Sequence, residues 1–221
     1  MSWVSTAIYY ERINRMVQRQ VGKTASAPML IESLDFSRIY RLQSEEDWQR
    51  AADIIADSAQ RLTDAGAEMI VIGANSMHKV YREVEARVAT PILHIAECVG
   101  TKMKQDGIER AALVGTRNVM TESFYRRRLV SHGVDLLPPD MNSVDELDRI
   151  IYEELMVGKA SKDAQRSLRS MFTNLQKDGA QAVILACTEL ELVVDVDANV
   201  LPIYDCTAIH ADAAARWIIG G

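Results

Sequence analysis

The first candidate for chemistry is a thiol that follows a run of apolar residues. Cys187 comes directly after the apolar run Ala182–Ala186, and Thr188 and Glu189 follow it. Such a run predicts a buried strand, and the acidic segment behind it predicts the start of a helix. The free N–H groups and the dipole at a helix N-terminus favour anions. We therefore expect the pKa of Cys187 to lie below the reference value of about 8.5.

An internal repeat connects this thiol with a second place in the chain. The segment Ala65–Val80 aligns without a gap onto Asp178–Val193, so that each counterpart lies 113 positions later in the sequence. The residue that matches Cys187 in the first copy is Ala74. The repeat therefore predicts two related halves, one with a thiol and one with a methyl group at the equivalent position.

Strands are expected to alternate with helices along the whole chain. The expected strands are Met29–Leu34, Ala67–Gly73, Ile92–Ile95, Arg110–Gly115, Val134–Leu137, Ala182–Ala186 and Val200–Tyr204. This alternation predicts an α/β fold with parallel sheets covered by helices on both faces. We expect two similar Rossmann-like or flavodoxin-like halves, related by a pseudo-twofold axis, with the active site in the cleft between them. Residues 1–106 plus 207–221 would form the N-terminal half, and residues 107–206 the C-terminal half.

Polar residues follow the expected strands, where open parallel sheets bind their ligands. They are Asp35, Ser37, Ala74–Ser76, Gly115-Thr116, Cys187-Thr188 and Asp205–Thr207. Hydroxyl and amide donors from Asn75, Ser76, Thr116 and Thr188 suit an acidic small molecule whose α-carbanion must be stabilised. The sequence contains no phosphate loop, no dinucleotide fingerprint and no lysine in an evident Schiff-base context. A cofactor-free mechanism is the simplest interpretation, although spacing alone leaves pyridoxal phosphate open.

Several other residues have a structural interpretation beside a functional one. Cys98 lies in a helical pattern and is expected in the core, and Cys206 is more often structural than part of a site. His78 is as well suited to helix capping or support as to catalysis. His94, His132 and His210 are expected to be structural. Asp35 and Asp205 could cap helices or turns instead of binding a ligand.

Composition excludes several classes of function. The chain has 221 residues, 31 acidic against 25 basic, and a net charge of −6, with no long basic tract. Nucleic acid and anionic membranes are therefore poor partners. No apolar run approaches the roughly 20 residues of a membrane span, and the N-terminus lacks the order of a signal peptide. Three cysteines fit a reducing cytosol without a disulfide framework, and no spacing predicts zinc.

Several motifs, in order along nearly the whole chain, resemble those of the cofactor-independent aspartate/glutamate racemase family. They are Met1–Thr6 with Tyr9-Tyr10 and Asn14, Ser33–Phe36, Asn75–His78, Gly115-Thr116 with Phe124-Tyr125, Cys187–Glu189, and Asp205–His210. The resemblance is closest to the amino-acid racemase branch. It implies a two-base mechanism in which two cysteines flank the α-carbon, one removing a proton and the other returning one to the opposite face.

The same resemblance implies roles for individual residues. Cys187 would be one acid–base group, and Ala74 occupies the position of the other. The α-carboxylate or its enolate would be held by Asn75, Ser76, Thr116 and Thr188. The side-chain pocket would be shaped by Ser2, Trp3, Ser5 or Thr6, with Lys159 on the substrate's second carboxylate. His78 and Glu189 would give support. The resemblance further implies no cofactor and a homodimer, whereas the expected cytoplasmic location and the expected absence of a metal follow from the number and spacing of the cysteines.

Two departures from the family pattern bear on function. A methyl group at Ala74 cannot exchange a proton, so two-sided racemisation should be lost or slowed by roughly 10²–10⁴-fold. The family pattern also has a strand ahead of its counterpart of Met1–Thr6, so we expect the first sheet to lack its opening strand. The expected function is therefore an impaired or one-sided racemase of aspartate, glutamate or a broader set of amino acids. A one-cysteine decarboxylase or isomerase of dicarboxylates and a non-catalytic amino-acid-binding protein are the alternatives.

Overall fold

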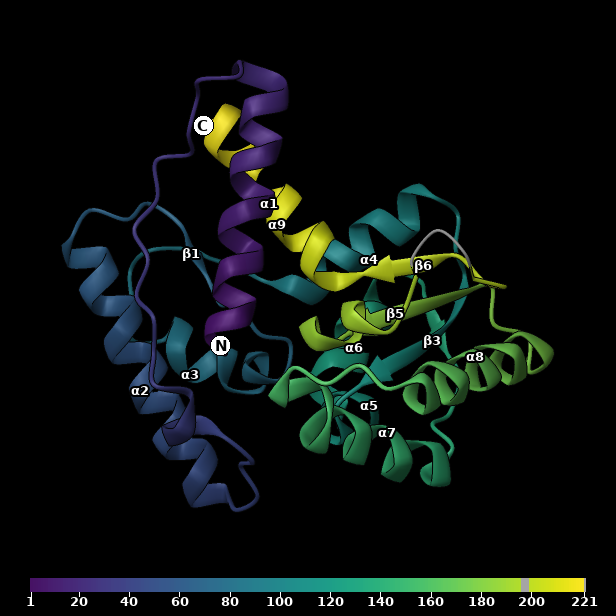
Figure 1. Cartoon of the computed structure of the whole chain (residues 1–221). Coiled ribbons are helices and arrows are strands. Elements are labelled where there is room, and N and C mark those ends of the chain that lie inside the picture. Colours follow the sequence, from purple (N-terminus) through teal and green to yellow (C-terminus); the bar gives the residue numbers. More distant parts are fainter. Residues whose placement is uncertain (196–198, 221) are drawn as a thin grey trace. The chain divides into compact units, whose positions relative to one another are not determined.

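The computed structural model describes residues 1–195 and 199–220 (Figure 1). Residues 196–198 and Gly221, which the expected halves include, lie outside the described residues. The chain divides into two units. Unit 1 comprises Met1–His94 together with the chain from His210 onward, and unit 2 comprises Ile95–Ile209. Each unit is an α/β structure with its own parallel sheet.

Unit 2 contains a parallel sheet in the order β4-β3-β5-β6. The strands are β3 (Arg110–Gly115), β4 (Asp135–Leu136), β5 (Ala182–Ala186) and β6 (Ile203–Asp205). All five residues of β5 are buried, as expected for a strand with neighbours on both edges and helices on both faces. Gly115 pairs with Ala186 and Leu185 pairs with Asp205, so three strands end close together at one edge of the sheet.

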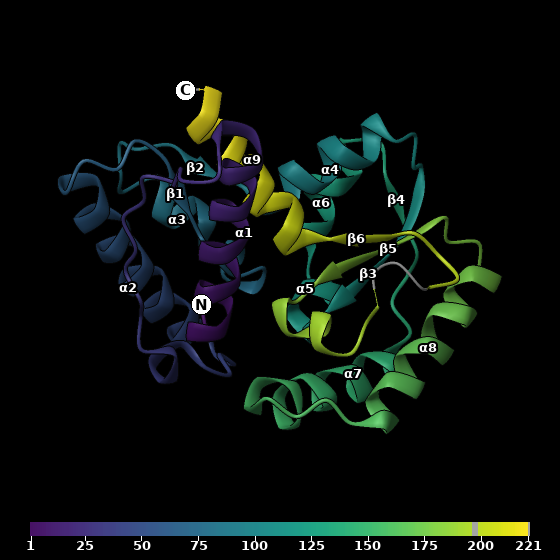
Figure 2. The same cartoon turned by 45° about the horizontal axis from the view of Figure 1, so that its top comes forward.

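Helices cover both faces of this sheet, as Figure 2 shows. They are α4 (Ile95–Gln105), α5 (Arg117–Thr121), α6 (Ser123–Ser131), α7 (Met141–Glu153) and α8 (Lys162–Lys177), with short 3₁₀ helices η3 (Leu155–Val157) and η4 (Thr188–Leu192). Side chains of β3 alternate between two cores. Ala112 and Val114 pack with α7 and α8, whereas Ala111 and Leu113 pack with α4 and α6. This alternation is the period of two that a strand imposes.

Unit 1 contains fewer paired strands than the sequence predicts. Its elements are α1 (Trp3–Val21), η1 (Phe36–Ile39), α2 (Glu45–Asp64), β1 (Ile70–Val71), η2 (Ser76–Val80), α3 (Tyr81–Glu85), β2 (Ile92–Leu93) and α9 (Cys206–Gly220). Only β1 and β2 pair, in parallel, within the described residues. The prediction of a strand at Met29–Leu34 is wrong. This segment belongs to no sheet, because no described strand lies beside it.

The internal repeat is visible in the backbone. Gly66 and Gly179, which end α2 and α8, have φ angles of 93° and 90°. This left-handed region suits glycine and is typical of a helix C-terminus. Their N–H groups donate to matching carbonyls, those of Thr63 at 2.9 Å and Gln176 at 3.1 Å. The two helix-to-strand turns therefore have the same geometry, as the sequence alignment predicted.

The two units differ from the expected division at α4. The expected N-terminal half extended to residue 106, whereas α4 belongs to unit 2. Ile95, Val99 and Met103 are fully buried and pack with Leu113 and Leu129 of unit 2. The sequence pattern identifies such a helix but does not say which core its apolar face joins. Helix α9 likewise begins in unit 2 and continues in unit 1 from His210 onward.

His210 ties three elements of unit 1 together. The Tyr9 hydroxyl lies 2.8 Å from Nδ1 of His210, and Nε2 lies 3.0 Å from the carbonyl oxygen of Leu93. One acceptor and one donor nitrogen describe a neutral imidazole. Burial, with a contribution from nearby His78, lowers the pKa of His210 to about 3. The ring of His94 packs edge-on against that of His78, at 4.5 Å between centroids.

We expect His210 to make unit 1 sensitive to acid. Its folded pKa of about 3 lies below the unfolded value of about 6.5, so the unfolded chain binds the proton first. The stabilisation is present above pH 6.5 and is lost as the pH falls toward 3. Between pH 7 and pH 5 the loss should be about 2 kcal/mol. Urea unfolding at both pH values measures it, and His210→Asn should reduce the difference. An unchanged difference in His210→Asn, alongside the half-buried control His132→Asn, would contradict this assignment.

Candidate functional site

The thiol predicted from the sequence lies at the end of β5. Cys187 is only 7% exposed, and its Sγ lies 3.3 Å from Oε2 of Glu189. The Thr188 hydroxyl donates to the same oxygen at 2.6 Å. Thr188 and Glu189 are also buried. The turn after β5 therefore gathers a thiol, a hydroxyl and a carboxylate in a small buried space.

The expected lowering of the pKa of Cys187 is wrong. Burial raises the pKa of this thiol well above its ordinary value, and the negative charge of Glu189 adds to the effect. The element that follows is a five-residue 3₁₀ helix, η4, and no long α-helix begins here. Its backbone N–H groups lower the pKa less than burial and the carboxylate raise it. The thiol is therefore protonated at neutral pH in this structure.

Two buried hydroxyl groups follow the strands on either side of β5. Thr116 follows β3 and is 7% exposed, and Thr207 lies in the first turn of α9 after β6 and is fully buried. The registers Gly115–Ala186 and Leu185–Asp205 bring both positions beside the end of β5. Neither Oγ1 atom has a hydrogen-bond partner within the described chain.

A buried polar atom without a partner is costly, and it is most often explained by a ligand or ordered water. The sequence predicts Thr116 as a hydrogen-bond donor to a ligand, because it follows an expected strand. Thr207 belongs to the predicted strand-end group Asp205–Thr207, but the family resemblance assigns it no contact with the substrate. The missing signal was burial, which cannot be read from a threonine in the sequence alone.

The equivalent turn in unit 1 is built differently. Ala74 is half-buried, and its carbonyl oxygen accepts a hydrogen bond from Nδ1 of His78 at 2.8 Å. Asn75 is 4% exposed and Ser76 is half-buried at the start of η2. His78 therefore makes a hydrogen bond to the backbone of the turn that carries Ala74 and Asn75.

The N-terminal candidates divide into structural and accessible residues. Ser2 caps α1, because its Oγ accepts from the Ser5 N–H at 3.1 Å. Thr6 donates its hydroxyl to the Ser2 carbonyl at 3.3 Å, and Ser5 is 1% exposed. Trp3 is 74% exposed, so its indole is available to a ligand.

The remaining candidates fall outside these two turns or have structural partners. Lys159 is exposed in the connection between η3 and α8. Cys206 is fully buried and accepts from the Tyr125 hydroxyl at 3.2 Å, as expected for a structural thiol. Asp35 caps η1, and Asp205 accepts from the N–H groups of Thr207 and Ala208, so both act as caps.

Residues 1–195 and 199–220 contain no group of three or more His, Cys, Asp or Glu side chains placed to hold a metal ion. In the same residues, no helix combines the length and apolar character needed to cross a membrane.

The chain matches a known protein family over most of its length. The Asp/Glu/hydantoin racemase family profile matches residues 1–214. A broad specificity amino-acid racemase, RacX of Bacillus subtilis, is 24% identical over 159 residues, 71% of this chain and 67% of that protein.

Two crystal structures are similar over almost the whole chain. A candidate Asp/Glu racemase from Yersinia pestis has 42% identity and a TM-score of 0.91, covering 99% of this chain and 96% of the other. An aspartate racemase homologue from Pyrococcus horikoshii has 30% identity and a TM-score of 0.81, covering 98% and 92%. The fold, the strand-end residues and these similarities agree: the chain belongs to the Asp/Glu/hydantoin racemase family.

Proposed function

We propose that this protein exchanges the α-proton of an amino acid without a cofactor, with Cys187 as its acid–base group. The main support is one observation: the Cys187 thiol is buried at the end of β5 and donates a hydrogen bond to the Glu189 carboxylate. A thiol in this position can take a proton from carbon only as a thiolate. Glu189 is the nearest described acceptor for the thiol proton.

The proposed exchange consists of two proton transfers. In the first, the Cys187 S–H bond breaks and Oε2 of Glu189 takes the proton, which leaves a thiolate. In the second, the thiolate takes the α-proton, and the electron pair of the C–H bond stays on the substrate as a carbanion or enolate. Reversal returns a proton to the same face. Preorganised hydroxyl donors can stabilise the developing charge, and this kind of stabilisation is often the largest catalytic contribution.

Ala74 limits the proposed proton exchange to one face of the α-carbon. A methyl group holds no exchangeable proton, so a second acid–base group is missing at the position that the family pattern assigns to cysteine. We therefore propose that proton exchange with retention is faster than racemisation. The substrate would be aspartate, glutamate or one of a broader set of amino acids.

Substrate contacts are proposed for polar residues that follow strands in the two units. Thr116 and Thr207 offer buried hydroxyl groups without protein partners in the described chain, which supports their assignment to an anionic ligand. The proposed α-carboxylate contacts are Asn75, Ser76, Thr116 and Thr188, with Ser2, Trp3, Ser5 or Thr6 and Lys159 on the side chain. A homodimer and a cytoplasmic location are further parts of the proposal.

A protonated thiol favours a second candidate function. If a carbanion forms by loss of CO₂ from a dicarboxylate, a single thiol acid is sufficient to protonate it. The raised pKa of Cys187 is suited to this proton donation, because the acid form is already present at neutral pH. Release of CO₂ from substituted malonates, abolished by Cys187→Ser, would favour this decarboxylase over the racemase.

We expect the protein to incorporate deuterium at the α-carbon of one enantiomer of its amino acid with retention of configuration. Proton NMR in D₂O, run separately on the D and L forms of aspartate, glutamate and other common amino acids, measures this exchange. Cys187→Ser should abolish exchange, whereas the half-buried Cys98→Ser is the matched control and should not change it. Absence of exchange from every enantiomer tested would contradict the proposal.

We expect Ala74→Cys to raise racemisation. A positioned acid or base contributes roughly 10²–10⁴-fold, so the racemisation rate of this variant should increase within that range. Circular dichroism or chiral chromatography follows the loss of one enantiomer. Ala74→Ser is the matched control, because its hydroxyl is a much weaker acid than a thiol. Equal racemisation by the Cys and Ser variants would contradict the role of position 74.

We expect Cys187 to react slowly with iodoacetamide at pH 8, because its thiol remains protonated there. Glu189→Gln removes a negative charge 3.3 Å from Sγ and should lower the pKa of Cys187. Alkylation at pH 8 should then be faster, as quantified by mass spectrometry of the peptide that contains Cys187. The peptide containing Cys206 provides an internal control. A slower reaction in Glu189→Gln would show that the carboxylate activates the resting thiol.

A further inference from the structure

Thr116 lies at the start of α5 without capping that helix. It is the N-cap residue, yet its side chain forms no hydrogen bond with an N–H group of the first turn. The residues that precede α1, α2 and α8 each accept such an N–H into their own hydroxyl group, and they are Ser2, Ser44 and Ser161. A threonine at an N-cap would ordinarily do the same. The Thr116 hydroxyl is therefore not used for the task that its place in the helix predicts.

A carboxylate from another helix holds the start of α5 instead. Helices α5 and α7 lie side by side (Figure 1). Oδ1 of Asp148, in α7, accepts the backbone N–H of Arg117 at 2.9 Å, and Arg117 is the first residue of α5. Asp145 lies three residues earlier, on the same side of α7, and pairs with the Arg117 guanidinium. Helix α7 therefore binds Arg117 by both its backbone and its side chain.

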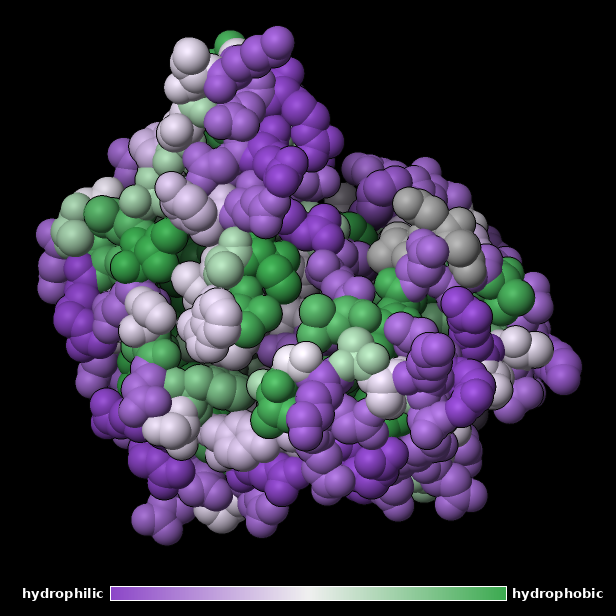
Figure 3. All heavy atoms as spheres, in the orientation of Figure 1, coloured by the Kyte–Doolittle hydropathy of each residue, from purple (hydrophilic) through white to green (hydrophobic). Residues whose placement is uncertain are grey.

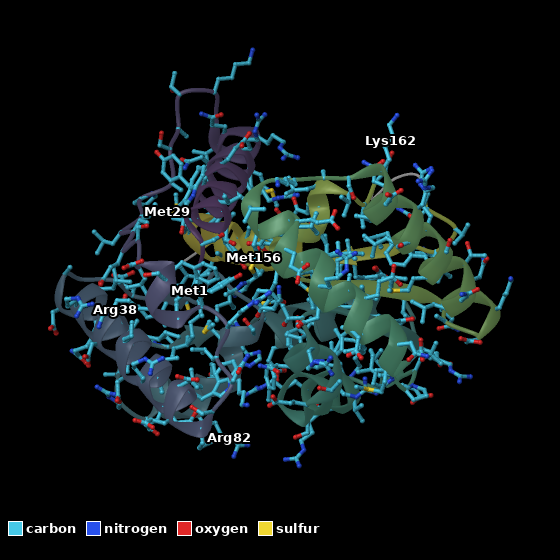
Figure 4. The ribbon with its side chains drawn as sticks, turned by 60° about the horizontal axis from the view of Figure 1, so that its bottom comes forward. Met1, Met29, Arg38, Arg82, Met156 and Lys162 are labelled. Carbon is cyan, nitrogen blue, oxygen red and sulfur yellow. The ribbon has the colours of Figure 1, made fainter. Side chains whose placement is uncertain are left out.

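Helix α7 is a firm support for this carboxylate. Its apolar face packs into the core that it shares with β3 and α8, through the buried residues Val144, Leu147, Ile150 and Ile151. Its outward side is mostly hydrophilic, as the lower right of Figure 3 shows. Met156, labelled in Figure 4, follows α7 in η3 and packs against the same core. Asp148 is half-buried, so core packing on both sides of it along the helix fixes its position.

The Thr116 side chain lies on the same face of the sheet as the Cys187 thiol. These two residues directly follow the last pair of β3 and β5, and both keep extended backbone angles. Alternate residues of an extended chain point to one face, and adjacent strands are about 4.8 Å apart. The residues two positions earlier, Val114 and Leu185, both enter the core that contains α7 and α8. Thr116 therefore places a buried hydroxyl, without a partner in the described chain, beside Cys187.

We propose that Asp148 is a positioning residue of the candidate site: it holds the start of α5 in place of Thr116, which leaves the Thr116 hydroxyl directed to a ligand beside Cys187. Without the Asp148 carboxylate, the start of α5 loses its side-chain acceptor. Thr116 can then cap the helix, as the serine residues before other helices do. Capping requires a different χ1 rotamer and turns the hydroxyl toward the helix. This inference rests on the proposed function, because the ligand is the anionic amino acid proposed above.

NMR of the protein with ¹³C-labelled threonine methyl groups tests the orientation of this hydroxyl without any substrate. The Thr116 methyl signal, identified by its absence in Thr116→Val, changes its chemical shift when χ1 changes. We expect Asp148→Ala to shift this signal. Asp148→Asn should leave it near its original position, because the amide oxygen can still accept the Arg117 N–H. The matched control Asp145→Ala, which removes a carboxylate bound to the guanidinium, should also leave it in place. Alanine is the best helix former, so α7 should persist in these variants.

The rate of α-proton exchange in D₂O tests what this orientation does for the reaction. Loss of one hydrogen bond to the substrate should lower kcat/KM by about tenfold, both in Asp148→Ala and in Thr116→Val. The double variant should be no slower than Thr116→Val, because Asp148 acts through the Thr116 hydroxyl. Asp148→Asn should keep most of the exchange rate. A residue that only stabilised the fold would lower kcat/KM by the same factor with and without this hydroxyl.

Two results would overturn the proposal. The first is an unmoved Thr116 methyl signal in Asp148→Ala. The second is an equal loss of kcat/KM from Asp148→Ala in the presence and in the absence of the Thr116 hydroxyl. If the unsubstituted protein exchanges no α-proton, the proposed function fails, but the methyl signal still decides whether Asp148 orients Thr116. A shifted signal then supports the positioning role, and an unmoved signal contradicts it.

Discussion

The parallel pairing of β5 with β3 and β6 is the constraint on which the candidate site depends. It brings the ends of three buried strands to one edge of a sheet, where the chain must turn and polar groups become available. Thr116, Cys187 and Thr207 occupy these three ends. Their proximity does not require flexible loops, because the strand register sets their spacing. Catalytic groups placed on rigid elements lose less freedom when a substrate binds.

Burial determines the chemical state of the thiol at this edge. A cysteine near backbone N–H groups is expected to ionise easily, but desolvation and the carboxylate of Glu189 act in the opposite direction and outweigh them. The resting protein therefore holds a proton at Sγ and a proton acceptor beside it. This arrangement suits a group that first donates or transfers its proton, since a protonated thiol is a weak nucleophile. In the proposed exchange, the thiol must therefore lose its own proton before it can take one from the α-carbon.

Much of the fold was predictable because the chain contains an internal repeat, whose two copies can be compared with each other. The gapless repeat predicted the matching turns at Gly66 and Gly179, and β3 was predicted with its observed bounds. The local sequence pattern was insufficient where strand pairing or helix packing depends on residues far away in the chain. Met29–Leu34 has the composition of a strand, yet its backbone pairs with no strand in the described structure. Helix α4 has an apolar face that joins the core of the following unit, which periodicity cannot reveal.

The positions of the candidate residues after strands were predictable from the sequence, but their electrostatics were not. Cys187, Thr188, Thr116 and the turn at Ala74 were identified from their positions after expected strands. In the structure the first three directly follow β5 or β3, and Ala74 lies three residues after β1. The direction of the pKa shift was wrong because burial is a property of the folded chain. The central claim is that Cys187 exchanges a proton at the α-carbon while Ala74 cannot. Deuterium incorporation in D₂O, measured together with optical rotation, tests it most directly. The account predicts label entering one enantiomer while its configuration is retained. Rapid interconversion of both enantiomers by the protein with Ala74 in place would contradict it.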